Sequence, residues 1–239
     1  MIASTALGWH APGVPPTTAR ERARAELTAE ITDLARAQLA TVGAAGLSLR
    51  AVARELGMAS SAVYRYFPSR NDLLTRLIID GYDAIGAAAE QADDPTAPPT
   101  DRWLTICRAV RHWARAHPHE YALLYGSPVP GYAAPPDTVP AATRVGAVLG
   151  RVLGDAARAG LLPAASGRST GTITPEVATV LGGEHPALDD TVRTRALLAW
   201  SGLFGTVSFE LFGQFVGVVT DADTFFDDAM RDLAGLIDL

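Results

Sequence analysis

The chain has 239 residues, of which 48% are hydrophobic and 19% are charged, and it contains one cysteine. This composition supports a sizeable core and excludes a disordered chain, a disulfide framework and a cysteine-rich zinc module. The twenty basic residues are all arginine and face 26 acidic residues, so the formal net charge is −6. A uniformly acidic chain would argue against nucleic acid as a partner. Whether a nucleic acid remains a possible partner therefore depends on where the charges lie along the sequence.

The charges are placed unevenly. Residues 1–90 carry nine arginines and nine acidic residues, whereas residues 91–239 carry eleven arginines and seventeen acidic residues. Within residues 48–76, five arginines stand against two acidic residues. A basic patch on an otherwise acidic chain indicates a small phosphate-contacting module joined to a body with another task.

Two segments bear on targeting. Residues 1–17 have neither a basic start nor a long apolar run, so we expect a flexible leader rather than a secretory signal. Residues 196–220 are long enough for a membrane span, but Glu210, Gln214 and four glycines interrupt them. We predict a buried helix there, no membrane contact and a cytoplasmic protein.

Hydrophobic residues repeat with a period near 3.6 and hardly alternate, so we predict an all-α fold. The first helix follows a capping box at Thr18 and Glu21 and ends at Gly43 and Gly46. We expect further helices over residues 49–56, 60–67, 70–91, 101–116, 118–125, 140–159, 190–213 and 221–237, and a mobile segment over residues 160–186.

Residues 93–100, with three prolines, are the clearest boundary in the chain. They divide it into a three-helix domain over residues 18–75, a connecting helix to about residue 92, and a larger helical domain over residues 93–239.

Residues 48–67 have the spacing of a helix-turn-helix. Ala53 is small enough for two short helices to cross closely, and Gly57 tolerates the positive φ of the turn. The second helix of such a motif enters the DNA major groove with its N-terminal residues on base edges. The residues expected to point into the core are Val52, Leu56, Met58, Val63 and Phe67.

The exposed face of the second helix carries residues with the chemistry to contact DNA: Ser60, Ser61, Tyr64 and Arg65. Arginine can bind guanine through two hydrogen bonds, serine can donate or accept, and Tyr64 and Tyr66 can reach phosphate or stack on sugar. Ser48 and Arg70, each at the start of a helix, suit phosphates.

Three runs together carry a resemblance: Leu-Ser-Leu-Arg at 47–50, Ala-x-x-Leu-Gly at 53–57, and Val-Tyr-Arg-Tyr-Phe-Pro-Ser-Arg-Asn-Asp-Leu-Leu at 63–74. They resemble the DNA-binding domain of the tetracycline-repressor (TetR) family, over about residues 18–75. The resemblance implies base and phosphate contacts by Arg50 and residues 60–66, Ala62 included, and a phosphate contact by Arg70 in place of the usual lysine. Ala59 stands where a Ser or Thr often caps the recognition helix, so we expect the cap at Ser60.

The larger domain resembles, by position and helix count, the effector-binding and dimerisation half of this family. Its last two helices are similar to those that form a four-helix bundle with a partner subunit, which implies a homodimer. Two apolar stripes suit that interface or the subunit's own core: Trp200, Phe204, Val207 and Leu211, and Phe226, Met230, Leu233 and Ile237.

An effector pocket in this domain would use aromatic residues with a few polar groups, although the same residues would suit a hydrophobic core. The candidates are Trp103, Cys107, Trp113, Tyr121, Tyr125, Trp200 and Phe204. Their apolar character favours a hydrophobic or aromatic small molecule, and no cofactor is expected. Gly146, Gly150 and Gly154 would allow a helix or a ligand to approach closely.

Two patterns suggest other chemistry. Residues 167–171 match the G-x-S-x-G pattern of hydrolases, but we predict no preceding strand. Pro118 breaks the helix between His112, His117, His119 and Glu120, which could otherwise group around a metal. We therefore expect neither an enzyme nor a metal site, and we interpret Cys107 as a packed residue rather than a redox sensor.

The sequence thus predicts a one-component transcriptional regulator, most simply a repressor released from a palindromic double-stranded DNA operator by a hydrophobic small molecule. The alternative is a helical small-molecule-binding protein with a vestigial helix-turn-helix.

Overall fold

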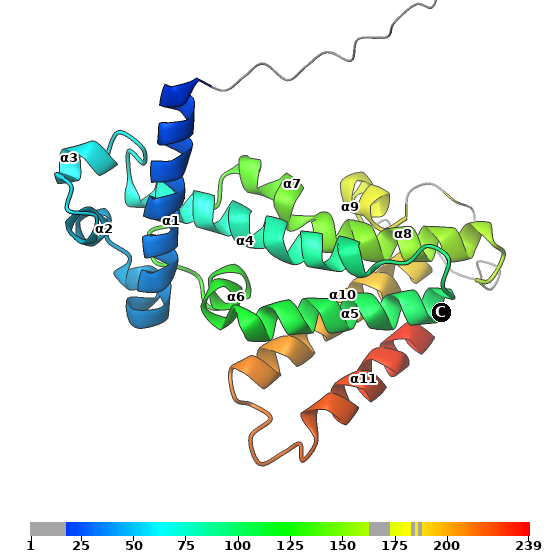
Figure 1. The fold of residues 1–239 in the computed structure, drawn as a ribbon. Helices are drawn as coiled ribbons and strands as arrows, with labels where there is room; N and C mark the ends of the chain where they lie inside the picture. Colours follow the sequence, from blue (N-terminus) through cyan, green and yellow to red (C-terminus); the bar gives the residue numbers. More distant parts are fainter. Residues whose placement is uncertain (1–17, 163–172, 183–184, 186–187) are drawn as a thin grey trace, which may run out of the picture.

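The computed structural model describes residues 18–162, 173–182, 185 and 188–239, and every regular element in these residues is a helix. The all-α prediction is therefore confirmed for the described part of the chain. The predicted leader, residues 1–17, lies outside it. Figure 1 shows a small unit of α1, α2 and α3 at one end and a larger helical unit at the other, with α4 running from one to the other.

Helix α1 (Ala19–Gly46) begins and bends where the sequence predicts. Thr18 Oγ1 accepts a hydrogen bond from Glu21 N (3.2 Å), and Thr18 N donates to Glu21 Oε2 (2.7 Å), which completes the capping box. Gly43 has a φ of +67°, a conformation that glycine adopts without strain. The helix therefore breaks at Gly43, and a last turn ends at Gly46.

Helices α2 (Leu49–Glu55) and α3 (Ser60–Val63) form the predicted helix-turn-helix, and Gly57 in the turn has a φ of +65°. Helix α3 is shorter than predicted. After Val63 the chain tightens into turns, with Arg65 N donating to Ala62 O at 3.3 Å. The predicted cap is also wrong, because Ala59 occupies the N-cap position and no side chain caps the helix.

The small unit has a hydrophobic core of its own. The motif positions predicted to point inward do so: Val52, Val63 and Phe67 are buried, and Leu56 and Met58 pack against them half-buried. Other members of this small core are Ile31, Ala35, Leu39, Leu47, Leu49, Ala53, Leu73, Leu74 and Leu77.

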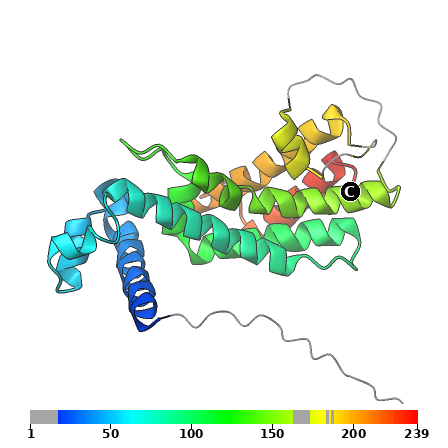
Figure 2. The ribbon, with the colours of Figure 1, turned by 90° about the horizontal axis from the view of Figure 1, so that it is seen from above.

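Helix α4 (Arg70–Ala92) belongs to both units. Its first half supplies Leu73, Leu74 and Leu77 to the small core, and its second half supplies Ile85 and Ala89 to the larger core. It lies along α5 (Pro99–Ala116) and α8 (Arg144–Arg158), as Figure 2 shows from above. The position of the helix-turn-helix is therefore fixed to the larger unit through one continuous helix.

The larger unit also contains α6 (Pro118–Tyr125), α10 (Asp190–Leu211) and α11 (Ala222–Leu236). The helix predicted over residues 140–159 is divided at Thr143 into α7 (Val139–Ala142) and α8, and a turn, η1 (Pro136–Thr138), precedes α7. In the segment predicted to be mobile, residues 160–186, the structure has a helix, α9 (Pro175–Val180), that the sequence did not predict, and residues 163–172, 183–184 and 186–187 lie outside the described residues. Thr174 Oγ1 caps α9 by accepting from Val177 N at 3.4 Å.

The end of α9 crosses α8 at its glycines. A Cβ at Gly150 would overlap the carbonyl oxygen of Val180, and one at Gly146 would lie 3.3 Å from Val180 Cγ1. The four-residue spacing of the glycines thus allows another helix to approach closely. This is one of the two uses that the sequence predicted, the other being the close approach of a ligand.

Residues 196–220 do not form one helix. Helix α10 ends at Leu211, and Gly213 and Gly217 take positive φ in the turns that follow. Across the described residues, the helices are too short or too polar to cross a membrane.

A buried ion-pair cluster holds the turn between α4 and α5. Arg102 is 4% exposed, and its guanidinium donates to both oxygens of Asp93, at 2.7 and 3.1 Å. It also donates to Asp155 Oδ2 of α8 at 2.9 Å. Because the Asp93 side chain is 5% exposed, its charge needs compensation, which Arg102 supplies through two hydrogen bonds and Arg151 Nη2 supplements from 3.9 Å.

We expect Arg102→Ala to lower the free energy of unfolding by about 3–5 kcal/mol, because it leaves the buried Asp93 carboxylate without its two hydrogen bonds and with Arg151 alone at 3.9 Å. Urea unfolding followed by circular dichroism measures the loss. Arg158→Ala is the control, since its exposed pair with Asp155 is worth about 1 kcal/mol or less. A loss for Arg102→Ala no larger than that of the control would contradict the prediction.

Candidate nucleic-acid interface and ligand cavity

The residues predicted to contact bases face away from the small core. Val63 is fully buried, whereas Ser61 is exposed and Ser60 and Ala62 are half-buried. In the turn after α3, Tyr64 is 40% exposed and Arg65 is exposed. Each of these side chains is therefore at least partly accessible to solvent, as a contact in the major groove requires.

Ser48 and Arg50 lie at the start of α2. Ser48 caps that helix, since its Oγ accepts from Ala51 N at 3.4 Å, and its backbone N donates to Gln38 Oε1 at 3.1 Å. A hydroxyl also has a hydrogen to donate, so Ser48 keeps a donor for a phosphate. Arg50 is exposed beside it.

Arg70 has a structural role that the sequence did not indicate. Its Nη2 donates to Ala44 O (2.6 Å) and Ala45 O (3.2 Å), and its Nε donates to Leu47 O (3.2 Å). These carbonyls end α1, so the guanidinium caps that helix. The predicted phosphate contact of Arg70 would have to use the remaining hydrogens, those of Nη1.

Tyr66 is engaged within the protein. It is half-buried against the small core, and the Cζ of Arg24 lies 5.1 Å from its ring centroid. Its hydroxyl is thus the group that can reach a phosphate, because the ring faces already have neighbours.

The arginines divide into two groups by their partners. Every arginine described between residues 102 and 231 lies within 4.0 Å of a carboxylate oxygen, and so do Arg36 and Arg76. Six exposed arginines have no such partner in the described part of the chain: Arg20, Arg22, Arg24, Arg50, Arg54 and Arg65.

This division decides where the protein is electropositive. A guanidinium paired with a carboxylate contributes little field at a distance, whereas an unpaired one attracts a polyanion. All six lie in residues 20–65, so within the described residues the exposed arginines without a carboxylate partner are on the small unit. Of these six, the sequence predicts Arg50 and Arg65 as DNA contacts and places Arg54 in the basic patch. It does not indicate Arg20, Arg22 and Arg24, because their lack of partners becomes evident only in the fold.

The aromatic residues proposed for an effector pocket pack mainly in the larger core, the alternative that the sequence left open. Trp103 Nε1 donates to Met230 O at 2.9 Å, and the rings of Tyr125 and Phe204 stack with centroids 4.3 Å apart. These contacts fill the space that a ligand would need. Five of the candidates are at most 7% exposed: Trp103, Cys107, Trp113, Tyr121 and Phe204.

Two buried polar groups in this core are held in their neutral forms. Tyr121 Oη donates to Phe204 O at 3.1 Å and lies 2.9 Å from Ser208 Oγ, and burial raises its pKa to about 12. Burial also raises the pKa of the Cys107 thiol, which disfavours the reactive thiolate. Both residues therefore act as packed core members.

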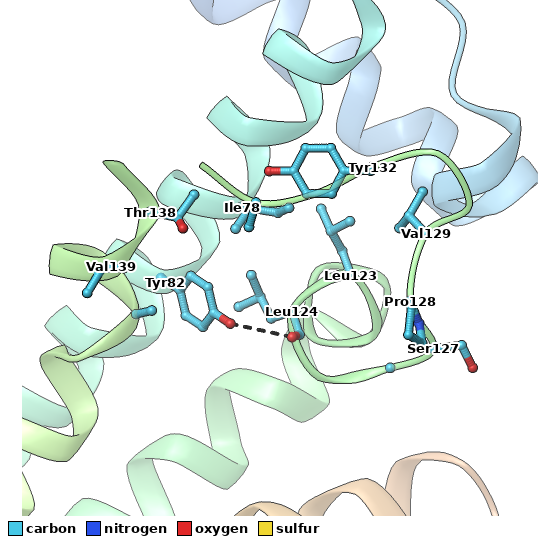
Figure 3. A pocket seen from close by; sticks show the side chains of 13 residues that line it. Ile78, Tyr82, Leu123, Leu124, Ser127, Pro128, Val129, Tyr132, Thr138 and Val139 are labelled. Carbon is cyan, nitrogen blue, oxygen red and sulfur yellow. Dashed lines mark hydrogen bonds between the residues drawn. The ribbon is translucent and has the colours of Figure 1, made fainter. Parts of the chain in front are cut away.

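The open space of the larger unit lies elsewhere. A cavity of about 400 Å³, shown in Figure 3, opens between α4, α6 and residues 126–142. Ile78, Tyr82, Leu124, Tyr132 and Val139 are among its lining residues. A second cavity, of about 470 Å³, lies between the end of α1 and α6. The two cavities share Leu123, Ser127, Pro128 and Val129.

Trp200 is the proposed pocket residue that borders a sizeable space. It lines a cavity of about 190 Å³ with Val177, Val180 and Leu197. It also borders, with Trp103, a gap of about 10 Å³, which is room for about one water molecule.

Residues 126–135, which we call the bridging segment, connect the first cavity to the small unit. Val129 and Tyr132 pack against the small core. The Tyr132 hydroxyl lies 3.0 Å from Thr75 Oγ1, and Asn71 Nδ2 donates to Gly131 O at 3.3 Å. The bridging segment therefore contacts both the cavity and the first half of α4.

Two of the four residues considered for a metal, His117 and Glu120, have other partners. His117 Nδ1 lies 2.9 Å from Trp113 O, and Glu120 pairs with Arg36 at 3.4 Å. In the described residues, no three His, Cys, Asp or Glu side chains group in a way that could hold a metal ion. The G-x-S-x-G pattern at 167–171 lies outside the described residues, which resume at residue 173.

Helices α10 and α11 present a different face to solvent from the stripes that the sequence singled out. Phe204, Val207, Phe226, Met230 and Ile237 are buried in the subunit. The exposed face of α10 carries Leu198, Ser201, Gly205, Phe209 and Phe212, spaced three or four residues apart. A Cβ at Gly205 would have no neighbour within 4 Å.

Two parts of the chain match known protein families. Residues 31–77 match "Bacterial regulatory proteins, tetR family", and residues 103–233 match "Tetracyclin repressor-like, C-terminal domain". The chain belongs to the TetR family. It is a TetR-family helix-turn-helix transcriptional regulator, and DNA binding is the activity of that family.

Relatives of this TetR-family chain cover nearly its whole length. It is 42% identical over 236 residues to HTH-type transcriptional regulator Mb1846 of Mycobacterium bovis, which covers 91% of this chain and 95% of the relative. The crystal structure of regulatory protein SCO4313 has a TM-score of 0.70 and 36% identity, covering 91% of this chain and all of that one. A protein of unknown function from Rhodococcus sp. RHA1 shares the fold, with a TM-score of 0.65 and 24% identity, covering 87% and 93%.

We expect Arg70→Ala to lower the free energy of unfolding by about 1.5–3 kcal/mol, because three carbonyls at the end of α1 lose a charged donor. Chemical denaturation measures the change. Arg65→Ala is the matched control, because Arg65 is exposed and unpaired and its removal stays within about 0.5 kcal/mol. Equal stability of the two variants would contradict the capping role.

Proposed function

We propose that this regulator is a repressor that binds a palindromic operator as a homodimer and leaves it when a hydrophobic small molecule binds the larger unit. The observation that carries the DNA-binding part is the placement of all six unpaired arginines in residues 20–65. The protein would act in the cytoplasm, where its operator DNA would lie.

The proposed contacts follow the chemistry of each side chain. Arg65 would read a base edge beside Ser60, Ser61 and Ala62, because arginine can bind guanine O6 and N7 together. Contacts to phosphate fix the register of the protein on the duplex but carry no sequence information. The phosphate contacts would come from Ser48, Arg50, Tyr64, Tyr66 and Arg70.

The homodimer would form through the outward faces of α10 and α11. Their exposed apolar side chains, Leu198, Phe209, Phe212 and Phe225, support this. A glycine inside a helix makes the helix less stable by about 1 kcal/mol than an alanine would. Among the described residues of the same subunit, no atom beyond the adjoining residues of α10 lies within 4 Å of the position that a Cβ at Gly205 would occupy, so packing within the subunit does not require a glycine there. Close approach of a helix from the partner subunit would explain why a glycine occupies this position. Two recognition helices would then fit half-sites about 34–36 Å apart.

The effector would bind in the cavity bordered by Tyr82 and Tyr132. Its volume of about 400 Å³ lies in the usual range for small-molecule sites, about 300–1,000 Å³, and most of its lining is apolar. A ligand that displaces Tyr132 would change the contact of the bridging segment with Thr75 on α4. A coupling of about 1–3 kcal/mol would then lower operator affinity by about 5–150-fold.

We expect the wild-type protein to bind a duplex that it selects from a random pool more tightly than a scrambled duplex, and more weakly as salt rises. Arg65→Ala should bind the selected duplex with a loss of about 1–3 kcal/mol and a weaker base preference. Fluorescence anisotropy at two salt concentrations measures both effects.

Arg115→Ala is the control, because it removes an arginine that is paired with Asp223 and Glu210, far from α3. If Arg65→Ala lost the same affinity for selected and for scrambled DNA, the proposal that Arg65 reads a base would be contradicted. A wild-type protein that ignores DNA but binds apolar ligands would instead support a small-molecule-binding protein with a vestigial motif.

We expect Gly205→Leu to raise the dimer dissociation constant by about tenfold or more, since overpacking a close interface costs about 1–3 kcal/mol. Sedimentation over a range of concentrations measures it. Ala84→Leu is the control, because it enlarges an exposed position of α4, away from α10 and α11. An unchanged dimer dissociation constant for Gly205→Leu would show that the dimer interface does not include Gly205.

A further inference from the structure

The first two turns of α1 carry three exposed arginines, Arg20, Arg22 and Arg24, and none of them has a carboxylate partner in the described residues. They precede residues 31–77, the part that matches the family of DNA-binding domains. Neither the recognition motif nor the capping of α1 uses them. Their charge is therefore available to an anionic partner.

Two of these arginines share one face of α1. At 3.6 residues per turn, positions 20 and 24 are separated by about 40° around the helix axis, and position 22 lies about 160° from each. Leu27 and Ile31 continue the face of Arg20 and Arg24 one and two turns later, and there they pack on the small core. The face that joins α1 to the helix-turn-helix thus extends beyond the core and ends in two arginines.

The contact with Tyr66 places this face next to the recognition segment. The Cζ of Arg24 lies 5.1 Å from the ring centroid of Tyr66, three residues after the end of α3. A guanidinium that stacks on an aromatic ring keeps the hydrogens in its plane available to an oxyanion. Arg24 is therefore held in position beside the DNA-reading surface without losing its donors.

We propose that Arg20 and Arg24 form a second DNA-binding site, which binds backbone phosphates just outside the half-site read by α3. One helical turn separates the two residues by about 6 Å along α1, and phosphates on one strand follow each other every 3.4 Å along the duplex axis, so two phosphates can be bound at once. Arg22, on the opposite face, takes no part. This inference rests on the proposed function, because it extends the surface that binds the operator.

The test compares wild type, the double variant Arg20→Ala/Arg24→Ala and the control Arg22→Ala. The probe is a duplex selected by the wild-type protein from a random pool, made once with about ten flanking base pairs on each side and once trimmed to the half-sites. Anisotropy titrations at several salt concentrations give the slope of log affinity against log salt. Melting temperatures of all three proteins show whether the variants are folded.

On the long duplex, the double variant should bind at least tenfold more weakly, and its salt slope should be smaller by about 4 per dimer, since each lost phosphate contact removes about 1. Arg22→Ala removes one unpaired charge but no proposed phosphate contact, so its loss of affinity should be the same on both duplexes and, on the long duplex, much smaller than that of the double variant. On the trimmed duplex, the difference between wild type and the double variant should shrink to a comparably small effect of charge.

The outcomes separate this site from the function on which it rests. Selective binding by wild type with an unchanged salt slope in the double variant overturns the second site and leaves the operator function intact. If Arg22→Ala lost as much affinity as the double variant, the assignment of the site to one face of α1 would be overturned, and a diffuse effect of charge would be indicated. A wild-type protein that selects no duplex overturns both the second site and the proposed operator.

Discussion

One continuous helix, α4, contributes side chains to both hydrophobic cores, and the position of the DNA-reading surface depends on it. Leu73 and Leu77 pack with α1–α3, and Ile85 and Ala89 pack in the larger unit. The first residue of the same helix, Arg70, caps the end of α1 through three carbonyls. The helix-turn-helix therefore cannot rotate relative to the larger unit unless α4 bends or moves as a whole. The first half of α4 is also where the bridging segment makes its hydrogen bonds.

The second organising constraint is the partition of charge. In the larger unit, arginines are used to connect helices: Arg102 joins the α4–α5 turn to α8, and Arg111 joins α5 to Glu210 of α10. Such pairs leave little field outside the protein. In the small unit, six exposed arginines lack a carboxylate partner in the described residues, so their charge extends into solvent. A net charge of −6 is thus compatible with DNA binding, because the arginines and carboxylates of the body largely neutralise one another where they meet.

Features set by neighbouring residues were predictable from the sequence. The capping box at Thr18, the break at Gly43 and the turn at Gly57 each depend on a few adjacent positions, and each is found where predicted. Contacts between distant positions were not predictable. Arg70 binds carbonyls more than twenty residues earlier, and Trp103 binds the carbonyl of Met230, which turns a pocket candidate into a core residue. The helix α9 was missed for a related reason, since its packing against glycines of α8 outweighs a local composition typical of loops.

The bridging segment has a consequence for how such a regulator can diversify. It belongs to neither set of core helices, yet it lines the cavity on one side and touches α4 on the other. Loops of this kind accept substitutions and changes in length more readily than packed helices do. Under the proposed function, sensitivity to a new effector would evolve in residues 126–135 while the operator sequence stays the same, and a new operator would evolve in α3 while the effector stays the same. Effector specificity and operator specificity would then be encoded in separate segments of the chain.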